Sequence, residues 1–207
     1  GQAFGRINGW GEDLRARLVS FAGGGKLIRG SLVAATADAL GSKVDDDVYT
    51  VAAALELIQS FLLIHDDIMD EDPVRRGMPA IYEQYRRYAH ENGYRAPERF
   101  GESMGICGGD VAALMAISAI GATSIAPAQR VRLMKLMTDE IAKVGVAQMA
   151  DVANGHSPHA ASEEAILSVY RYKTGRYTFS LPLMLGAILA GSDDEIIDAL
   201  SEWGELE

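Results

Sequence analysis

The sequence predicts an all-α protein, an antiparallel helical bundle, and two observations support this class. Long segments with apolar residues at helical spacing dominate the 207 residues, whereas alternating apolar and polar stretches are scarce. Helix-boundary signals also recur, since Pro127 stands where a first-turn proline would and Gly41 where a C-terminal glycine would. Connections between these segments are short, which favours a bundle.

The expected helices follow one another along the chain. They span residues 30–40, 48–69, 79–92, 102–125, 127–153, 163–190 and 193–203. The last begins in a capping box formed by Ser192 and Glu195, and the clearest loop is the polar stretch NGHSPHAAS at residues 154–162. Because no internal repeat or linker interrupts this pattern, we expect a single domain over residues 1–207.

Composition narrows the classes of partner. A formal net charge of -10 argues against a nucleic acid or an anionic membrane surface, because both require a basic face. No stretch reaches the roughly 18 uninterrupted apolar residues of a membrane span. Cys107 is the single cysteine, so no disulfide can form within these residues, and a cytoplasmic protein is expected. Cys107 itself is expected to be a small core residue.

The stretch FLLIHDDIMDEDPVRRGMP, residues 61–79, concentrates negative charge at the end of an apolar helix. Asp66 and Asp70 are four residues apart and share a helix face, with Asp67 adjacent. Asp72-Pro73 disfavours further helix, so these like charges lie near a negative helix end. A bound cation relieves both effects, and carboxylate oxygens suit Mg²⁺ better than Zn²⁺. A solvated acidic surface is the alternative, although so apolar a helix should end in the interior or a cleft.

Three basic clusters accompany the acidic one. They are GGGKLIRG at residues 23–30, RRG at 75–77 and YRYKTGRYTF at 170–179. Each alone has an ordinary explanation: a flexible loop, local charge neutralisation, and a helix segment. Together with the carboxylates they suggest a ligand that carries several phosphates and is bridged by metal ions.

The chain resembles the trans-prenyltransferases, the isoprenyl diphosphate synthases, and its motif style is that of the archaeal-type geranylgeranyl diphosphate synthases. The resemblance is carried by GGGKLIRG, LELIQSFLLIHDDIMDEDPVRRG, VGVAQMADV and YKTG, in the family's order. It implies an all-α bundle around a deep central cavity and a homodimer. It also implies condensation of isopentenyl diphosphate with an allylic diphosphate.

The resemblance also assigns roles to residues. Asp66 and Asp70 are implied ligands of Mg²⁺, with Mn²⁺ as a substitute, and Asp67 supports them. The implied contacts of isopentenyl diphosphate are Lys26, Arg29, Gln59 and Arg76, and those of the allylic diphosphate are Arg75, Lys173 and Thr174. Gln59 stands where many members have histidine. Gln148 and Asp151 match a G-Q-x-x-D element, in a supporting role, with Ala147 in place of its glycine.

The implied mechanism needs no protein base. Mg²⁺ and cationic side chains stabilise the leaving diphosphate, the allylic C–O bond ionises, and the isopentenyl double bond attacks the cation. A proton is then lost to the released pyrophosphate, and an apolar cavity excludes water.

Product length is implied by the two residues that lie five and four positions before the first aspartate. These are Phe61 and Leu62, which would form the floor of the cavity and favour a C20 product. The alternative is that Phe61 is an ordinary core residue.

The family's second aspartate-rich motif is absent from these 207 residues. Asp193, Asp194 and Asp198 in SDDEIID have the wrong spacing and are interpreted as a helix start. We therefore expect the 207-residue chain by itself to be incompetent for turnover. Two other functions stay open: a terpene cyclase, which would have no use for Lys26, Arg29 and Gln59, and a regulatory subunit of a heteromeric synthase.

Overall fold

The computed structural model describes residues 7–206, and these residues form two compact units. The first consists of residues 7–26 and 56–116, and the second of residues 27–55 and 117–206. Across both units the described elements are helices apart from one short hairpin, which confirms the all-α class. The expectation of a single domain over residues 1–207 stays a prediction.

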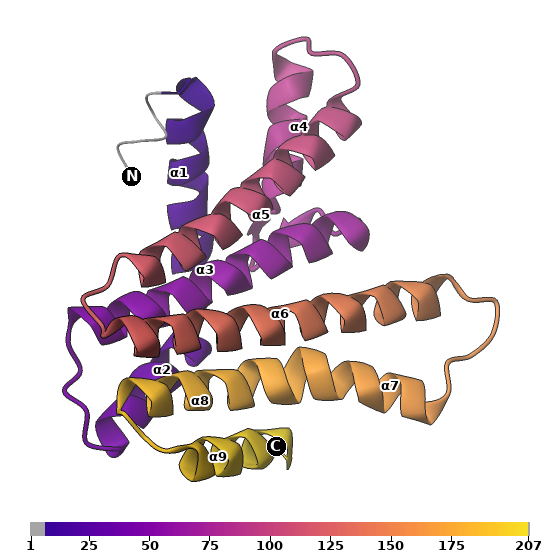
Figure 1. Ribbon diagram of the computed structural model, residues 1–207. Coiled ribbons are helices and arrows are strands. Elements are labelled where there is room, and N and C mark those ends of the chain that lie inside the picture. The colour runs from indigo at the N-terminus through magenta and orange to yellow at the C-terminus, as the bar shows by residue number, and fades with distance from the viewer. Residues whose placement is uncertain (1–6, 207) are drawn as a thin grey trace. The chain divides into compact units, whose positions relative to one another are not determined.

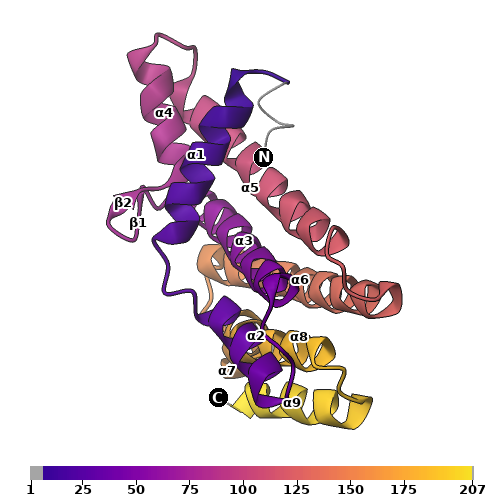
Figure 2. The same ribbon diagram turned by 90° about the vertical axis from the view of Figure 1, so that its left-hand side faces the viewer.

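The first unit contains α1 (Gly9–Gly23), the C-terminal part of α3 (Asp46–Met69), α4 (Ile81–Glu91) and most of α5 (Pro97–Gly121). Between α3 and α4 the strands β1 (Val74–Arg75) and β2 (Met78–Pro79) form an antiparallel hairpin. In Figure 2 this hairpin lies beside α1. Neither α1 nor the hairpin was predicted from the sequence.

The core of the first unit joins its four helices. The buried residues there, each at 4% exposure or less, come from α1, α3, α4 and α5: Leu18, Ile64, Ile81, Tyr85 and Ala112. Phe61 packs against this cluster and is itself partly buried. The residue five positions before the first aspartate therefore contacts the hydrophobic core without being fully buried in it.

Glycines on α5 allow the neighbouring helices to approach closely. A Cβ on Gly101 would lie 2.5 Å from the carbonyl oxygen of Tyr82, and one on Gly105 would lie 2.7 Å from Cδ1 of Ile68. A Cβ on Gly109 would overlap the ring of His65. Gly101 thus allows α5 to approach α4, while Gly105 and Gly109 allow α5 to approach the end of α3 that carries the aspartates.

The second unit is built around a buried helix. It contains α2 (Ile28–Ala39), the N-terminal part of α3, α6 (Pro127–His156), α7 (Glu163–Tyr170), the π-helix η2 (Arg171–Ser180), α8 (Leu181–Leu189) and α9 (Asp194–Leu206). Every residue from Leu181 to Ile188 is buried, and α8 packs against α2, α6 and α9. Figure 1 shows α6, the rod formed by α7, η2 and α8, and α9 lying side by side.

The helix ends agree in part with the sequence signals. Gly41 has a φ of 86° and follows α2, and Pro127 lies in the first turn of α6, as predicted. The Ser192 capping box was wrong, because the Asp193 carboxylate accepts the hydrogen bond from the Ile196 N–H at 3.1 Å. The loop expected at residues 154–162 begins later, because α6 continues to His156.

Two further expectations concern solvent exposure. Cys107 is exposed rather than part of the core, because its side chain borders an open pocket beside α5, so that prediction was wrong. By length and composition alone, α3 and α5 could each cross a membrane. Both supply buried side chains to the units described above, as core helices of soluble proteins do.

Candidate active site

The aspartate cluster lies at the C-terminal end of α3, in the first unit. The helix stops because Glu71 adopts a left-handed conformation with a φ of 54°. The N–H of Asp72 then bonds to the carbonyl of Asp67 at 2.9 Å, and that of Glu71 to Ile68 at 3.4 Å. This pair of bonds is a Schellman motif, formed here without glycine. It places the carboxylates at a helix end whose carbonyls are already satisfied.

Asp67 is fully buried and forms an ion pair with Arg75. The Arg75 Nε donates to Asp67 Oδ1 at 2.6 Å, and Nη2 contacts the same oxygen. Asp67 Oδ2 is also buried and has no hydrogen-bond partner among the described residues. Burial raises the pKa of Asp67 by more than the guanidinium of Arg75 lowers it. The ion pair therefore offsets only part of the cost of burying this carboxylate.

The remaining carboxylates are more accessible. The side chain of Asp66 is 25% exposed, with Oδ2 at 3.8 Å from Arg75 Nη2, and Asp70 is exposed. Asp72 is 3.7 Å from the same Nη2 and 56% exposed. Arg75 thus faces three acidic residues, although the described part of the chain has no group of three metal-binding side chains that could hold a metal by themselves.

Arg76 occupies the turn of the hairpin. With Gly77 it forms the two-residue connection, and both residues have positive φ, 54° for Arg76 and 76° for Gly77. Such values belong to a type I′ turn, which is costly for a residue other than glycine. The hairpin accepts this backbone strain, and as a result the Arg76 side chain projects from its turn.

The glycine run before α2 makes room for the Arg76 guanidinium. Arg76 Nη1 donates to the carbonyl of Phe21 at 3.1 Å, and its guanidinium lies 5.8 Å from the centre of the Phe21 ring. A Cβ on Gly25 would lie 2.8 Å from that Nη1. Lys26 follows immediately and is exposed. Lys26 and Arg76, both predicted to contact isopentenyl diphosphate, therefore belong to two segments of the first unit, the glycine run and the hairpin, that touch each other.

A pocket of about 290 Å³ adjoins both arginines. Its lining comes from α1, the glycine run, the hairpin and α4: Ser20, Phe21, Gly24, Arg75, Arg76, Met78, Pro79 and Gln84. Two hydrogen bonds fix the Gln84 side chain at the pocket wall: it donates to the Pro79 carbonyl at 2.8 Å and accepts from Arg17 Nη1 at 2.8 Å. The pocket combines two guanidinium groups with an open side, which suits a phosphate group.

The residues predicted along α3 before the aspartates are partly buried. Gln59 is half-buried, and its Oε1 is buried without a hydrogen-bond partner among the described residues. Leu62 is half-buried as well, and the Phe61 ring lies edge-on to the His65 ring at 4.8 Å. His65 Nε2 lies 3.1 Å from the carbonyl of Ile106, which fixes the ring against α5.

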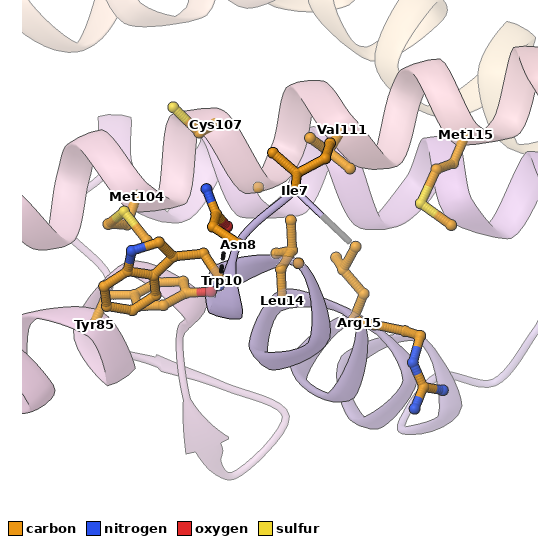
Figure 3. Close-up of a pocket in the computed structure, with 13 residues that line it drawn as sticks. Ile7, Asn8, Trp10, Leu14, Arg15, Tyr85, Met104, Cys107, Val111 and Met115 are labelled. Atoms are coloured by element: carbon orange, nitrogen blue, oxygen red, sulfur yellow. Dashed lines mark hydrogen bonds between the residues drawn. The ribbon is translucent and has the colours of Figure 1, made fainter. Parts of the chain in front are cut away.

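A second pocket of about 280 Å³ in the first unit is apolar and lies between α1 and α5. Figure 3 shows Leu14, Val111 and Met115 among its lining, with the guanidinium of Arg15 extending away from them. None of the residues predicted for the site lines it.

The second unit holds the other predicted residues. Arg29 Nη2 donates to Thr178 Oγ1 at 2.6 Å, and its guanidinium lies 4.4 Å above the Tyr177 ring. Lys173 Nζ donates to Asp151 Oδ2 at 2.6 Å. The π-helix η2 therefore contacts both a predicted isopentenyl-diphosphate residue, Arg29, and a predicted supporting residue, Asp151.

Thr174 and Gln148 complete the set in the second unit. Thr174 is exposed on η2, next to Lys173, and Gln148 is half-buried on α6. Thr174 therefore keeps its hydroxyl accessible to a ligand.

Sequence reasoning missed two contacts at these sites. Asp67 was expected to support metal ligands, and its ion pair with Arg75 depends on a hairpin that carries no typical Asn-Gly signal. Arg176 was treated as one more cation of YKTGRY, yet it bonds to the buried Glu140. No local pattern marks Glu140, since its partner is 36 residues away.

Comparison with known proteins agrees with these motifs. A sequence profile described as polyprenyl synthetase matches residues 14–206. A geranylgeranyl diphosphate synthase of Methanosarcina mazei is 30% identical over 183 residues, which are 88% of this chain and 51% of that protein. A farnesyl diphosphate synthase of Geobacillus stearothermophilus is 31% identical over an alignment of length 206 that covers 96% of this chain and 63% of that protein.

Solved structures agree as well. The crystal structure of geranylgeranyl pyrophosphate synthase from Corynebacterium glutamicum, complexed with isoprenyl diphosphate and magnesium, superposes with a TM-score of 0.91. It is 32% identical, and the match covers 99% of this chain and 59% of that one. The chain spans about half the length of the Methanosarcina relative. From the profile match over residues 14–206, the chain belongs to the polyprenyl synthetase family.

Proposed function

We propose that this chain serves a prenyltransferase that condenses isopentenyl diphosphate with an allylic diphosphate to give a linear short-chain prenyl diphosphate. The observation that carries the proposal lies within the first unit. There Arg75 contacts the carboxylates of Asp66 and Asp67, while Arg76 lies over Gly25 beside Lys26. Groups suited to binding phosphate and groups suited to binding a cation thus occur together in the first unit, which supports the proposal.

The residues proposed for isopentenyl diphosphate are Lys26, Gln59 and Arg76 in the first unit and Arg29 in the second. Arg76 offers a planar guanidinium at the wall of the 290 Å³ pocket, which suits bidentate contact with phosphate. The half-buried Gln59 can donate an amide N–H where a histidine would otherwise donate. Arg29 is held in a defined orientation by Thr178 and Tyr177.

The residues proposed for the allylic diphosphate are Arg75 in the first unit and Lys173 and Thr174 in the second. Each offers donors to oxygens that gain negative charge as the C–O bond breaks. Asp151 orients Lys173 through the 2.6 Å hydrogen bond, and Gln148 lies one turn earlier on the same helix. This is the supporting role proposed for both.

The carboxylates fit Mg²⁺, and Mn²⁺ in its place. Asp66 and Asp70 are one turn apart, Asp67 Oδ2 is a buried oxygen without a described partner, and all the donors are oxygens. Proteins commonly bind Mg²⁺ through one or two carboxylates, while water and phosphate supply its other ligands. When bound, the ion would neutralise charge on the leaving diphosphate.

The protein's own part in the chemistry is to hold charge and exclude water. Arg75 and Lys173 stabilise the departing diphosphate, and Lys26 and Arg76 hold isopentenyl diphosphate. The apolar side chains of Phe61 and Leu62 keep water from the cation and form the floor beneath the growing chain. The proton leaves to the released pyrophosphate, so no protein base is required.

We propose a C20 product, since one aromatic residue, Phe61, lies five positions before Asp66 and Leu62 lies four before it. The relatives above are named for both C20 and C15 products. A cytoplasmic location is proposed with this function, because the single cysteine is exposed and both substrates are water-soluble anions.

We further propose a homodimer. On α6, Val131, Val146 and Met149 are 65%, 68% and 72% exposed, and these apolar side chains are what such a contact would bury. Sedimentation of the purified protein should give twice the monomer mass.

One assay tests the function. The gene product that carries this sequence is incubated with Mg²⁺, labelled isopentenyl diphosphate and allylic primers of several lengths, and the products are separated by chromatography. Labelled linear prenyl diphosphates support the proposal, with C20 the expected main product. Unlabelled cyclic hydrocarbons would identify a cyclase instead, and the absence of any reaction would favour a regulatory subunit.

A further inference from the structure

The second unit contains a buried carboxylate for which no role has been assigned above. Glu140 on α6 is 3% exposed. Arg176 from η2 donates its Nε to Glu140 Oε2 at 2.8 Å and its Nη2 to Oε1 at 2.7 Å. Lys143 Nζ donates to Oε1 at 2.6 Å. Both carboxylate oxygens are therefore satisfied, mainly by a two-point contact that fixes the guanidinium in one orientation.

This contact determines the charge state of Glu140. Burial alone would raise the pKa of the carboxyl, but hydrogen bonds from Arg176 and Lys143 outweigh burial and lower it. Glu140 therefore stays ionised near neutral pH and holds Arg176 through two charge-assisted bonds. Arg176 is only 16% exposed, so water competes weakly for these bonds.

Arg176 belongs to an unusual segment. The ten residues of η2 form a π-helix, a geometry that occurs mostly as single turns and is less favourable than the α-helix. Contacts from outside must stabilise it. The Ser180 hydroxyl donates to the Ser201 carbonyl at 2.8 Å, and Lys173 reaches Asp151 at 2.6 Å. The Glu140–Arg176 pair is more buried than the Lys173–Asp151 pair, because the side chain of Glu140 is 4% exposed and that of Asp151 is 46% exposed.

We propose that Glu140 is a positioning residue that, through Arg176, holds η2 in the register that presents Lys173 and Thr174 to a diphosphate. This inference rests on the function proposed above. Arg176 lies two residues after Thr174, within the same turn, so its two-point attachment limits rotation of that turn. Without it the segment can relax toward α-helical spacing, which turns Lys173 and Thr174 away from their present direction.

The expected effect on turnover is large although Glu140 touches no substrate. A displacement of about 1 Å in a group that holds the reacting centre can cost on the order of a hundredfold in rate. We therefore expect Glu140→Gln to lower kcat/KM for the allylic diphosphate by about tenfold to a hundredfold. Arg176→Lys should act similarly, because lysine keeps the charge but cannot make the two-point contact.

Two control variants separate position from charge. Asp139→Asn removes a carboxylate next to Glu140 on α6 that pairs with Lys135 on the exposed surface. Lys143→Gln removes the other partner of Glu140 but leaves the Arg176 contact in place. Both should stay within about twofold of the wild type, since neither contact holds η2.

A double variant separates positioning from stability. Glu140→Gln leaves a cation without its carboxylate, whereas Glu140→Gln with Arg176→Gln removes both charges and should recover much of the lost stability. If Glu140 positions η2, the double variant stays as slow as the single one in kcat/KM. Recovery of activity together with stability would overturn the proposal, as would a Glu140→Gln variant that behaves like Asp139→Asn.

Two further readouts do not depend on turnover. In the full gene product, Glu140→Gln should speed hydrogen exchange of amides 171–180 relative to Asp139→Asn. It should also weaken the binding of pyrophosphate with Mg²⁺ about tenfold, measured by calorimetry. If the wild type makes no prenyl product, the proposed function fails, while these two measurements still decide whether Glu140 positions η2. Unchanged exchange and unchanged binding would refute it.

Discussion

The ion pair between Asp67 and Arg75 can be tested by removing its buried charge. Asp67→Asn keeps the shape of a side chain that is 0% exposed but replaces the carboxylate that accepts from Arg75 Nε at 2.6 Å. Because asparagine has nearly the same volume, no cavity forms, and the change reports on charge alone. Arg75 then faces only Asp66 and Asp72, at 3.8 and 3.7 Å.

The structure sets the size of the effect. Removing one partner of a buried ion pair costs about 3–5 kcal/mol. Arg75 is 26% exposed, so water can solvate part of the uncompensated guanidinium, and burial already opposes ionisation of Asp67. We therefore expect a loss of about 2–3 kcal/mol in the free energy of unfolding, somewhat below the range for fully buried pairs.

The matched control is Asp72→Asn. It makes the same chemical change against the same arginine, but Asp72 is 56% exposed and the distance is 3.7 Å. Exposed pairs contribute about 0–1 kcal/mol, so this variant should lose less than about 1 kcal/mol. The difference between the two variants isolates the contribution of burial.

The assay is urea unfolding followed by tryptophan fluorescence. The chain has two tryptophans, and Trp10 packs against the core of the first unit, so a Trp203→Phe background reports on that unit alone. Equal losses for Asp67→Asn and Asp72→Asn would refute the reasoning. So would a failure of Asp67→Asn with Arg75→Gln to recover stability, because removing both charges should be nearly neutral.

Three other changes test the remaining roles. Phe61→Ala should lengthen the products seen by chromatography, and an unchanged product profile would contradict the floor assignment. It should also cost about 2–3 kcal/mol of stability, less than a fully buried phenylalanine would, because Phe61 is only partly buried. Gly25→Ala places a methyl group 2.8 Å from Arg76 Nη1, and the arginine side chain can move to make room. We therefore expect a loss of under about 1 kcal/mol in stability but a roughly tenfold increase in KM for isopentenyl diphosphate. Gly23→Ala, with open space around its Cβ, should change neither. Arg86 and Arg87 lower the pKa of Glu83 to about 2 from 4.5, so Glu83 stabilises the fold above pH 4.5 and loses this contribution as the pH falls toward 2. Glu83→Gln should cost about 1–2 kcal/mol of stability at pH 7, a modest loss because Arg86 and Arg87 are partly exposed. It should also make the stability measured by urea unfolding depend less on pH between about pH 4.5 and 2. An unchanged pH dependence would argue against the ion pairs of Glu83 with these arginines.

Most helices could be predicted because their signal is local. The apolar spacing of α2 to α9 and punctuation such as Gly41 and Pro127 depend only on neighbours in the chain. The missed helix α1 also carries such a signal, since Trp10, Leu14, Leu18 and Phe21 are spaced four, four and three apart and face the core. Its many charges and glycines obscured that spacing.

The contacts within the site could not be predicted in the same way. The Asp67–Arg75 pair requires a turn in which Arg76 adopts a positive φ, a conformation that the sequence RRG does not specify. The Glu140–Arg176 pair requires η2 to be a π-helix packed on α6, and propensity alone does not distinguish a π-helix from an α-helix. Motifs identified the chemical groups, while tertiary packing determined their partners.

The same contacts bear on how an acidic chain would bind the proposed diphosphate. The chain carries a formal charge of -10, so its overall field opposes a diphosphate. Arg75 and Lys173 each contact a carboxylate, Asp67 and Asp151, and these carboxylates hold the cations in place but also compete for them. The proposed diphosphate would therefore have to share cations that are already paired. Affinity then depends on additional positive charge near Asp66 and Asp70, which is the physical reason to expect Mg²⁺ to be required for binding as well as for chemistry.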